Sequence, residues 1–260
     1  MINAIFAIVV LDLKRFWVDR ARLIAGLIQP LLYLFVLGAG IGASSKMGGG
    51  DYRRFIFPGT VGLSLLFSAT FAAITIVFDR QIGFFKAVLV APVPRPAIAM
   101  GKIIAGAIQS FAQGLILLPF APLAGVPLDL LQVLEMMAAM ALASLTFSTI
   151  GVAFACRFTS TTVFPIVSNA VLLPMFFLSG SLYPLKLAPG WMQVAAHFDP
   201  VAYAVDLMRG AVLGSFFFPI PLSFGALGLT MGLLIWAAVR VFNRGEDDSG
   251  LGATRFNWRR

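Results

Sequence analysis

The sequence is poor in the residues that carry most metal, redox and acid–base chemistry. It has one cysteine, Cys156, and one histidine, His197, and its carboxylates are scattered along the chain. A lone cysteine excludes an intramolecular disulfide, and a metal site would have to be built from carboxylates alone. We therefore expect no metal or redox centre, and the clustered constellation that an embedded enzyme needs is missing.

Charge is also scarce, which excludes an ordinary soluble domain. Globular proteins are about half apolar and about one quarter charged. This chain is 60% hydrophobic and 12% charged, with 25 phenylalanines and a mean hydropathy of +0.94. Lipid is therefore the expected surroundings. In a membrane protein, the side on which the positive charges lie indicates the orientation, so the net charge of +8 does not by itself point to nucleic acid. We expect no nucleic-acid partner.

Long uncharged runs are what the sequence has instead. A helix needs roughly 20 mainly apolar residues to cross a bilayer. Six runs without Asp, Glu, Lys, Arg or His are long enough: Leu23–Ser45, Phe55–Phe78, Ile103–Leu128, Met136–Cys156, Phe158–Leu185 and Gly210–Val239. In lipid such runs satisfy their backbone hydrogen bonds as helices, and the alternation of a membrane barrel is absent. The sequence predicts an all-α membrane protein with one six-span domain over residues 23–240.

The cations divide unevenly between the two sides of this bundle. With the N-terminus inside, fourteen of the 19 lysines and arginines lie in cytoplasmic segments and five in outer segments. The positive-inside rule then predicts that both termini are cytoplasmic. Residues 241–260 mix charge with glycine and are expected to form a cytoplasmic tail.

Residues 1–22 are expected to form an amphipathic helix along the cytoplasmic membrane surface. One helical face carries Phe6, Val9, Leu13, Phe16 and Trp17. The opposite face carries Lys14, Arg15, Asp19 and Arg22. This division is typical of helices that lie in the membrane interface. A first span that begins early is the alternative.

The segment between the fifth and sixth spans is apolar but interrupted. Pro184, Pro189 and Pro200 break it, so it is unsuited to span. Trp191 and Tyr203 suit a membrane interface. Short helices within the outer leaflet and an ordinary interfacial loop both fit this composition.

The stretch FDRQIGFFKAVLVAPVPRP brings charges and prolines between two uncharged runs. As a helix it has one apolar stripe to hold it against its own domain, formed by Phe78, Ile82, Phe85 and Leu89. Asp79 and Lys86 lie opposite, and Phe84 and Val88 form a second edge for a partner. The prolines from Pro92 onward end the helix. A plain cytoplasmic loop on lipid head groups is the alternative.

Three stretches resemble one transporter family. DRQIGFFKAVLVAPVPR, followed by GK, resembles the cytoplasmic segment of type-2 permeases of ATP-binding-cassette (ABC) exporters. RFIFPG at the second span and FFLSGSLYPLKLAPGWMQVAAHFDPVAYAVDLMRG in the outer segment are similar to the same family. The branch includes daunorubicin-type efflux and nodulation-factor or polysaccharide export permeases, and the resemblance covers nearly the whole chain. Ala87 and Asp199 depart from it, since the family often has Glu and Asn there.

The resemblance implies a coupling helix from Asp79 to Pro92 that docks on an ATPase subunit. The residues it assigns to the ATPase contact are Asp79, Arg80, Gly83, Phe84, Lys86, Val88 and Pro92. It also implies a pair of re-entrant helices that cap the exit, with Gly180, Pro184, Trp191, Pro200, Tyr203, Asp206 and Arg209. The implied partners are two ATPase copies, a second permease copy (identical or a close paralogue) and the lipid of a bacterial inner membrane.

The chain lacks a nucleotide-binding motif of its own. Its only Gly-Lys pair is Gly101-Lys102, and Ile103 stands where a phosphate-binding loop needs Ser or Thr. We therefore expect a non-catalytic subunit that binds no cofactor, with ATP and Mg²⁺ held by the partner ATPase. The expected function is ATP-driven export of an amphipathic or lipid-linked substrate, such as a drug, a lipid or a glycan.

An ion-coupled secondary transporter or channel is the alternative function. Such proteins keep titratable residues inside their spans, and the six uncharged runs have none. The residues expected to line a translocation path are apolar or mildly polar: Phe67, Phe71, Asn169, Phe176 and Phe177.

Overall fold

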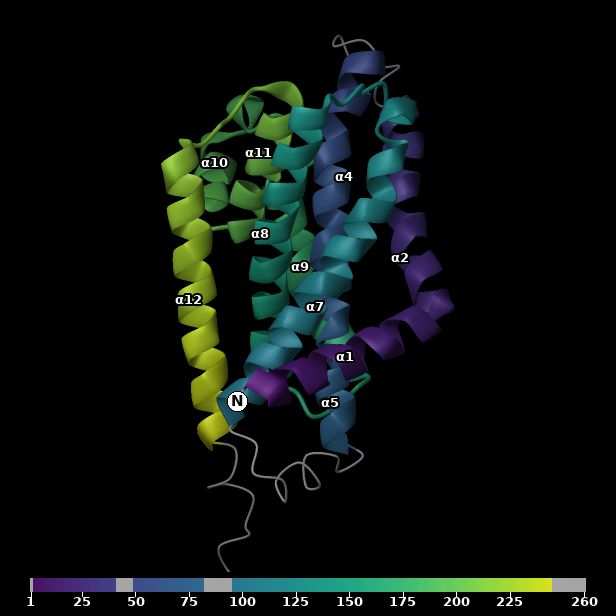
Figure 1. The fold of residues 1–260 in the computed structure, drawn as a ribbon. Helices are drawn as coiled ribbons and strands as arrows, with labels where there is room; N and C mark the ends of the chain where they lie inside the picture. Colours follow the sequence, from purple (N-terminus) through teal and green to yellow (C-terminus); the bar gives the residue numbers. More distant parts are fainter. Residues whose placement is uncertain (1, 41–48, 82–94, 245–260) are drawn as a thin grey trace, which may run out of the picture.

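The computed structural model describes residues 2–40, 49–81 and 95–244 (Figure 1). This part of the chain is almost entirely helical and contains no strand, so the predicted all-α class is confirmed. The longer helices are α2 (Arg20–Leu32, continued by a π-turn at Tyr33–Leu37), α4 (Gly49–Ala72), α7 (Arg95–Leu117), α8 (Leu130–Ala155) and α12 (Ile220–Arg244). The shorter ones are α1 (Ile2–Val18), α5 (Ile74–Gln81), α9 (Val163–Leu178), α10 (Gly190–His197) and α11 (Pro200–Leu213).

Five helical segments of the described chain are long and apolar enough to cross a membrane. They are Arg20–Gly40, Tyr52–Gln81, Pro96–Phe120, Leu130–Ala155 and Ile220–Arg240. The fifth predicted run contains only α9, whose 16 residues rise about 24 Å at 1.5 Å each. This is less than the roughly 30 Å of a bilayer core. Five of the six predicted spans therefore have the required length, and α9 is a shorter apolar helix.

The last predicted run begins ten residues too early. Gly210 belongs to α11, which ends at Leu213, and at the next residue, Gly214, the backbone enters the left-handed region at φ 65°. Glycine adopts this conformation without the steric cost that a Cβ brings. The chain turns there, and the final span starts at Ile220. An uncharged run therefore contains two helices with a turn between them.

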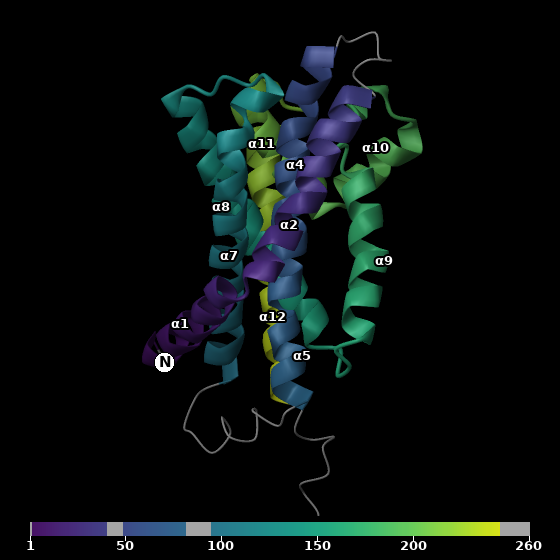
Figure 2. The ribbon, with the colours of Figure 1, turned by 90° about the vertical axis from the view of Figure 1, so that its right-hand side faces the viewer.

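The centre of the bundle is the packing of α4 against α7, α8 and α11 (Figure 2). Side chains with at most 1% exposure meet there: Phe57 and Leu66 of α4, Met140 and Phe147 of α8, and Met208 of α11. In lipid, close van der Waals contact replaces much of the hydrophobic driving force between helices. Gly151 allows such contact, because a Cβ there would lie 2.8 Å from the Thr70 Cα.

Helix α1 crosses one end of the bundle instead of running along it (Figure 1). Val9 and Phe16 of its predicted apolar face are buried, and α1 packs chiefly against α7. Phe6 and Trp17 of that face are 68% and 60% exposed. The apolar face is thus divided between the bundle and the outside, and its position on a membrane surface stays a prediction.

The two ends of the bundle carry different elements. The N-terminal helix, α5 and the last turns of α12 lie at one end, whereas α10 and α11 lie toward the other (Figure 1). The break between α1 and α2 falls at Asp19, and α12 reaches Arg244. The first and last described helical ends thus share one end of the molecule, as the predicted topology requires.

Candidate functional site

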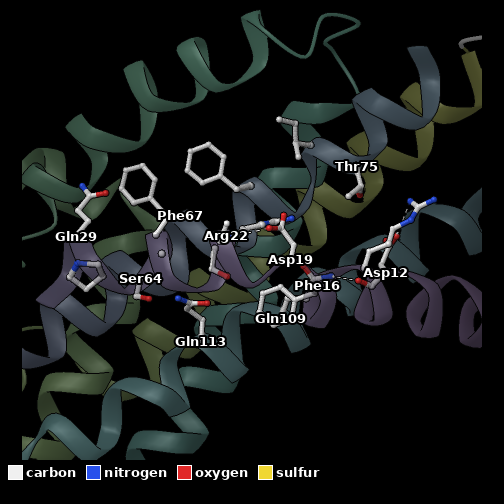
Figure 3. Close-up of a pocket in the computed structure, with 18 of the residues that line it drawn as sticks. Asp12, Phe16, Asp19, Arg22, Gln29, Ser64, Phe67, Thr75, Gln109 and Gln113 are labelled. Carbon is white, nitrogen blue, oxygen red and sulfur yellow. Dashed lines mark hydrogen bonds and ion pairs between the residues drawn. The ribbon is translucent and has the colours of Figure 1, made fainter. Parts of the chain in front are cut away.

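A cavity of about 680 Å³ lies among α1, α2, α4, α5 and α7 (Figure 3). Four phenylalanines form much of its apolar lining: Phe16, Phe67, Phe71 and Phe78. The rings of Phe67 and Phe71 stack with their centroids 5.8 Å apart. Small-molecule sites have volumes of roughly 300–1,000 Å³ and mostly apolar walls with a few polar groups. The cavity is therefore of a size and kind that suits a ligand.

Polar side chains complete the lining of the cavity. Gln109 of α7 donates from Nε2 to the Asp12 carbonyl at 3.2 Å, and Gln113 donates to the Leu23 carbonyl at 3.1 Å. Asp19 caps α2 by accepting from the Arg22 amide at 3.1 Å. Two glutamines of α7 thus hold α1 and α2 in place on one side of the cavity.

The predicted path residues separate into two groups. Phe67 and Phe71 line the cavity. Phe176 is fully buried, with its ring edge-on to Tyr33, and Phe177 is 43% exposed. Neither they nor Asn169 line this cavity. Their part in a path stays a prediction.

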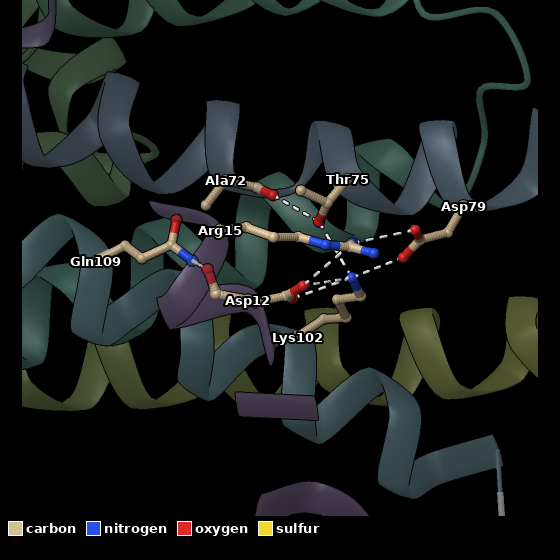
Figure 4. A network of polar contacts seen from close by, with 7 residues as sticks. All are labelled: Asp12, Arg15, Ala72, Thr75, Asp79, Lys102 and Gln109. Atoms are coloured by element: carbon tan, nitrogen blue, oxygen red, sulfur yellow. Dashed lines mark hydrogen bonds and ion pairs between the residues drawn. The ribbon is translucent and has the colours of Figure 1, made fainter. Parts of the chain in front are cut away.

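Beside the cavity lies a buried ion-pair network that joins three elements (Figure 4). The Lys102 ammonium of α7 is 3.0 Å from a carboxylate oxygen of Asp12 in α1 and 2.9 Å from one of Asp79 in α5. It also donates to the Thr75 hydroxyl at 3.2 Å. Lys102, Asp12 and Asp79 are 7%, 3% and 3% exposed. One ammonium thus ties α1, α5 and α7 together.

Arg15 balances the charge of this network. Its guanidinium lies 3.3 Å from Asp79 and 3.7 Å from Asp12. Two cations therefore face two carboxylates, and the side chain of Arg15 is 42% exposed, so it also reaches the outside. Buried charges of this kind are stable only when they are paired and hydrogen-bonded.

The network gives Asp79 partners within its own chain. Its carboxylate is 3% exposed and shared between Lys102 and Arg15, and its expected contact with an ATPase stays a prediction. Arg80 donates to the Cys156 carbonyl at 2.8 Å, at the end of α8. Phe78, expected to face its own domain, lines the cavity and is 49% exposed.

The other expected ATPase-contact residues lie outside the described residues: Gly83, Phe84, Lys86, Val88 and Pro92. The same holds for Ile82, Phe85 and Leu89 of the expected own-domain stripe. Sequence reasoning missed Asp12 and Lys102 as a pair. The signal available was a lysine next to the third span and an aspartate within the amphipathic segment, 90 residues apart.

At the opposite end of the bundle, the predicted outer residues form structural contacts. Asp206 accepts from the Phe217 and Phe218 amides at 2.9 and 3.0 Å. Arg209 donates to the Gly180 carbonyl at 2.9 Å, and its guanidinium lies 4.0 Å from the centre of the Phe55 ring. The two charged residues thus connect α11 to α4, to the turn after α9 and to the turn before α12.

The remaining outer residues define the turns around α10 and α11. Gly180 has φ +73°, and a Cβ there would meet Leu185, so glycine is required at this turn. Pro184 precedes a short 3₁₀ turn, Pro200 begins α11, and Trp191 is 66% exposed. The Tyr203 hydroxyl donates to the His197 carbonyl at 2.8 Å.

Asp199 caps α11 by accepting from the Val201 amide at 2.9 Å. Its second carboxylate oxygen is buried without a partner. Burial raises the pKa of Asp199 from 3.8 to about 7, against the hydrogen bond from Val201, which lowers it. The residue is 6% exposed and lies between α10 and α11, outside the spans.

The long apolar helices and their packing define a multi-pass helical membrane protein. Residues 3–213 match the ABC-2 type transporter family, and the chain belongs to this family. Together these findings make it a transport permease with several membrane-crossing helices.

Named relatives agree with this assignment. The chain is 32% identical over 197 residues to Nodulation protein J of Rhizobium leguminosarum bv. trifolii, covering 75% of each chain. It is 28% identical over 234 residues to the inner membrane transport permease YadH of Escherichia coli (strain K12), covering 87% of this chain and 89% of the relative. It is also 26% identical over 205 residues to the putative transport permease ycf38 of Cyanophora paradoxa, with 75% and 71% covered.

Proposed function

We propose that this chain is the permease subunit of an ATP-driven exporter in a bacterial inner membrane, and that it moves an amphipathic or lipid-linked substrate outwards. The observation that carries the proposal is the cavity in a chain of the ABC-2 type transporter family. Stacked aromatic rings stand beside amide and guanidinium groups there. Such a lining suits a molecule with one apolar and one polar part.

The energy comes from a separate ATPase subunit, which binds ATP and Mg²⁺. Lys102 is the only lysine that follows a glycine, and it is held between Asp12 and Asp79. An ammonium in that position is not free to bind phosphate. The chain is accordingly a non-catalytic subunit that binds no cofactor of its own. Two ATPase copies and a second permease copy, identical or closely related, complete the exporter.

Coupling between ATPase and cavity uses the ion-pair network. Helix α5 continues the span of α4 to Gln81, and its last residues, from Asp79 on, begin the segment expected to dock on the ATPase. Asp79, near the end of α5, is tied through Lys102 to α7 and α1. Since α1, α5 and α7 all line the cavity, a displacement of α5 reaches the cavity walls through contacts that are already made.

Transport in inverted membrane vesicles tests this function. The permease is produced with its ATPase, and uptake of daunorubicin and of a head-group-labelled phospholipid is measured with and without ATP. We expect uptake to require ATP and to stop when the phosphate-binding lysine of the ATPase is replaced. Uptake that continues without ATP, and stops when the proton gradient is collapsed at constant ATP, would instead support an ion-coupled transporter.

A further inference from the structure

Three polar atoms around the cavity are buried and have no hydrogen-bond partner. They are Nη2 of Arg22, Oγ of Ser64 and Oε1 of Gln109. They come from α2, α4 and α7, and Figure 3 shows the three side chains around the same space. Ser64 and Gln109 are 2% and 3% exposed. A buried donor or acceptor without a partner costs about 1–3 kcal/mol. Three around one cavity therefore indicate a polar ligand.

Of the charged groups around the cavity, Arg22 is the one available to pair with an anion. Arg15 is paired with Asp12 and Asp79, and those carboxylates are also paired with Lys102. Asp19, the remaining carboxylate of the lining, accepts from the backbone amide of Arg22 at 3.1 Å. Among the described residues, the Arg22 guanidinium has no carboxylate at ion-pair distance. Its Nη2 is a buried, charged donor beside an apolar wall.

The Ser64 Oγ and the Gln109 Oε1 determine which ligand groups can bind next to the anion. The Ser64 hydroxyl donates to an oxygen or accepts from a donor, and the Gln109 carbonyl oxygen accepts. The Gln109 Nε2 is already used at the Asp12 carbonyl, so the amide is held in place and its oxygen is left without a partner. Next to them, Phe67 and Phe71 present stacked rings that offer no hydrogen-bond donor to an anion but cover an alkyl chain.

We propose that this cavity binds an amphiphile with an oxyanion head group, phosphate or carboxylate, that also carries a hydroxyl or N–H. Arg22 pairs with the oxyanion, Ser64 donates to it, and Gln109 accepts from the hydroxyl or N–H. The alkyl part lies against Phe67 and Phe71. This inference deepens the proposed function, because it names the chemical class of the exported substrate, and it rests on that function for its role in transport.

Binding to the purified full-length permease tests the proposal without ATPase or ATP. The protein is kept in a neutral maltoside detergent and titrated with dodecyl phosphate, and bound ligand is counted by native mass spectrometry. Inorganic phosphate, dodecanoate and dodecyltrimethylammonium are the comparison probes. We expect saturable binding of one dodecyl phosphate per chain, weaker or equal binding of dodecanoate, and none of the cation. If inorganic phosphate at the same concentration displaced dodecyl phosphate, the alkyl chain would contribute nothing to binding, and the proposal of an amphiphilic ligand would be overturned.

Arg22→Gln should weaken dodecyl phosphate binding about ten- to hundredfold, the range of a hydrogen bond to a charged group. Arg22→Lys should recover most of the loss. Arg20→Gln is the matched control, because Arg20 stands in the same helix, is exposed and does not line the cavity. Ser64→Ala should weaken binding about five- to tenfold and, as a small change, leaves the fold intact. Equal affinity in wild type, Arg22→Gln and Ser64→Ala would overturn the proposal.

The outcome separates this inference from the proposed function. A permease that binds dodecyl phosphate through Arg22 but does not export it with any ATPase would leave the site valid and refute the exporter. ATP-driven export of daunorubicin that is unchanged in Arg22→Gln, together with no binding of dodecyl phosphate, would leave the exporter and refute the site.

Discussion

Replacing Lys102 by Met tests whether the buried network holds α1, α5 and α7 together. The change removes the ammonium that lies 3.0 Å from Asp12 and 2.9 Å from Asp79, both 3% exposed. Removing one partner of a buried ion pair typically costs about 3–5 kcal/mol, because the remaining charge is uncompensated. Arg15 stays within 3.7 Å of both carboxylates and offsets part of this loss. We therefore expect a loss of about 3 kcal/mol, the lower end of the range.

The assay is thermal unfolding of the purified permease in detergent, followed by a fluorescence probe of tertiary packing. For a chain of this size, about 3 kcal/mol corresponds to a decrease of roughly 6–12 °C in the midpoint. Lys186→Met is the matched control, since Lys186 is exposed at the other end of the bundle, and it should shift the midpoint little.

A second variant separates charge from packing. Lys102→Met combined with Asp79→Asn removes one cation and one anion and leaves Arg15 beside Asp12. The double variant should recover much of the stability that Lys102→Met loses, because no uncompensated carboxylate remains. If Lys102→Met unfolds at the wild-type midpoint, the ammonium does not hold the three helices together, and the reasoning about coupling through α5 fails with it.

Asp199→Asn should flatten the pH dependence of stability. The pKa of Asp199 is about 7 in the folded chain and 3.8 in the unfolded chain, so between these values the folded chain holds a proton that the unfolded chain releases. The stability of the wild type therefore falls as pH rises from about 4 to 7. The variant, which keeps a capping side chain, should equal wild type near pH 4 and exceed it at pH 8 by at most about 4 kcal/mol in unfolding titrations. Gly151→Leu should abolish stable folding, measured as yield after size exclusion, because its side chain would enter the Thr70 backbone; normal yield would refute this packing. Phe84→Ala should leave permease yield unchanged but lower ATPase co-purification, by about 2 kcal/mol of affinity if Phe84 is a central contact; undiminished co-purification would remove Phe84 from the contact. In a Cys156→Ser background, a cysteine at Trp191 should be labelled from outside intact cells and one at Gly250 should not, and the reverse pattern would invert the topology.

Much of the fold was accessible from composition and periodicity. Uncharged runs predicted the all-α class and most of the spans, because a lipid-embedded backbone has few alternatives to the helix. The same reasoning overextended the last run, since the φ of Gly214 is a local backbone property that hydropathy does not report. It also gave α9 more length than its 16 residues. Among the predicted path residues, Phe67 and Phe71 line the cavity, whereas Phe176 is buried with its ring against Tyr33, which is distant in sequence.

The sequence by itself determined that the chain lies in lipid, that it is helical and that it lacks the residues for metal, redox or acid–base chemistry. These properties depend on residue types and their order along the chain. Only the tertiary structure decided which charges are partners. Asp79 reads as exposed next to a cytoplasmic loop, yet it is buried because α1 crosses the end of the bundle and brings Asp12 and Arg15 against Lys102. The cavity and the unpartnered Arg22 Nη2 arise in the same way, since both depend on the space left between helices that are far apart in sequence.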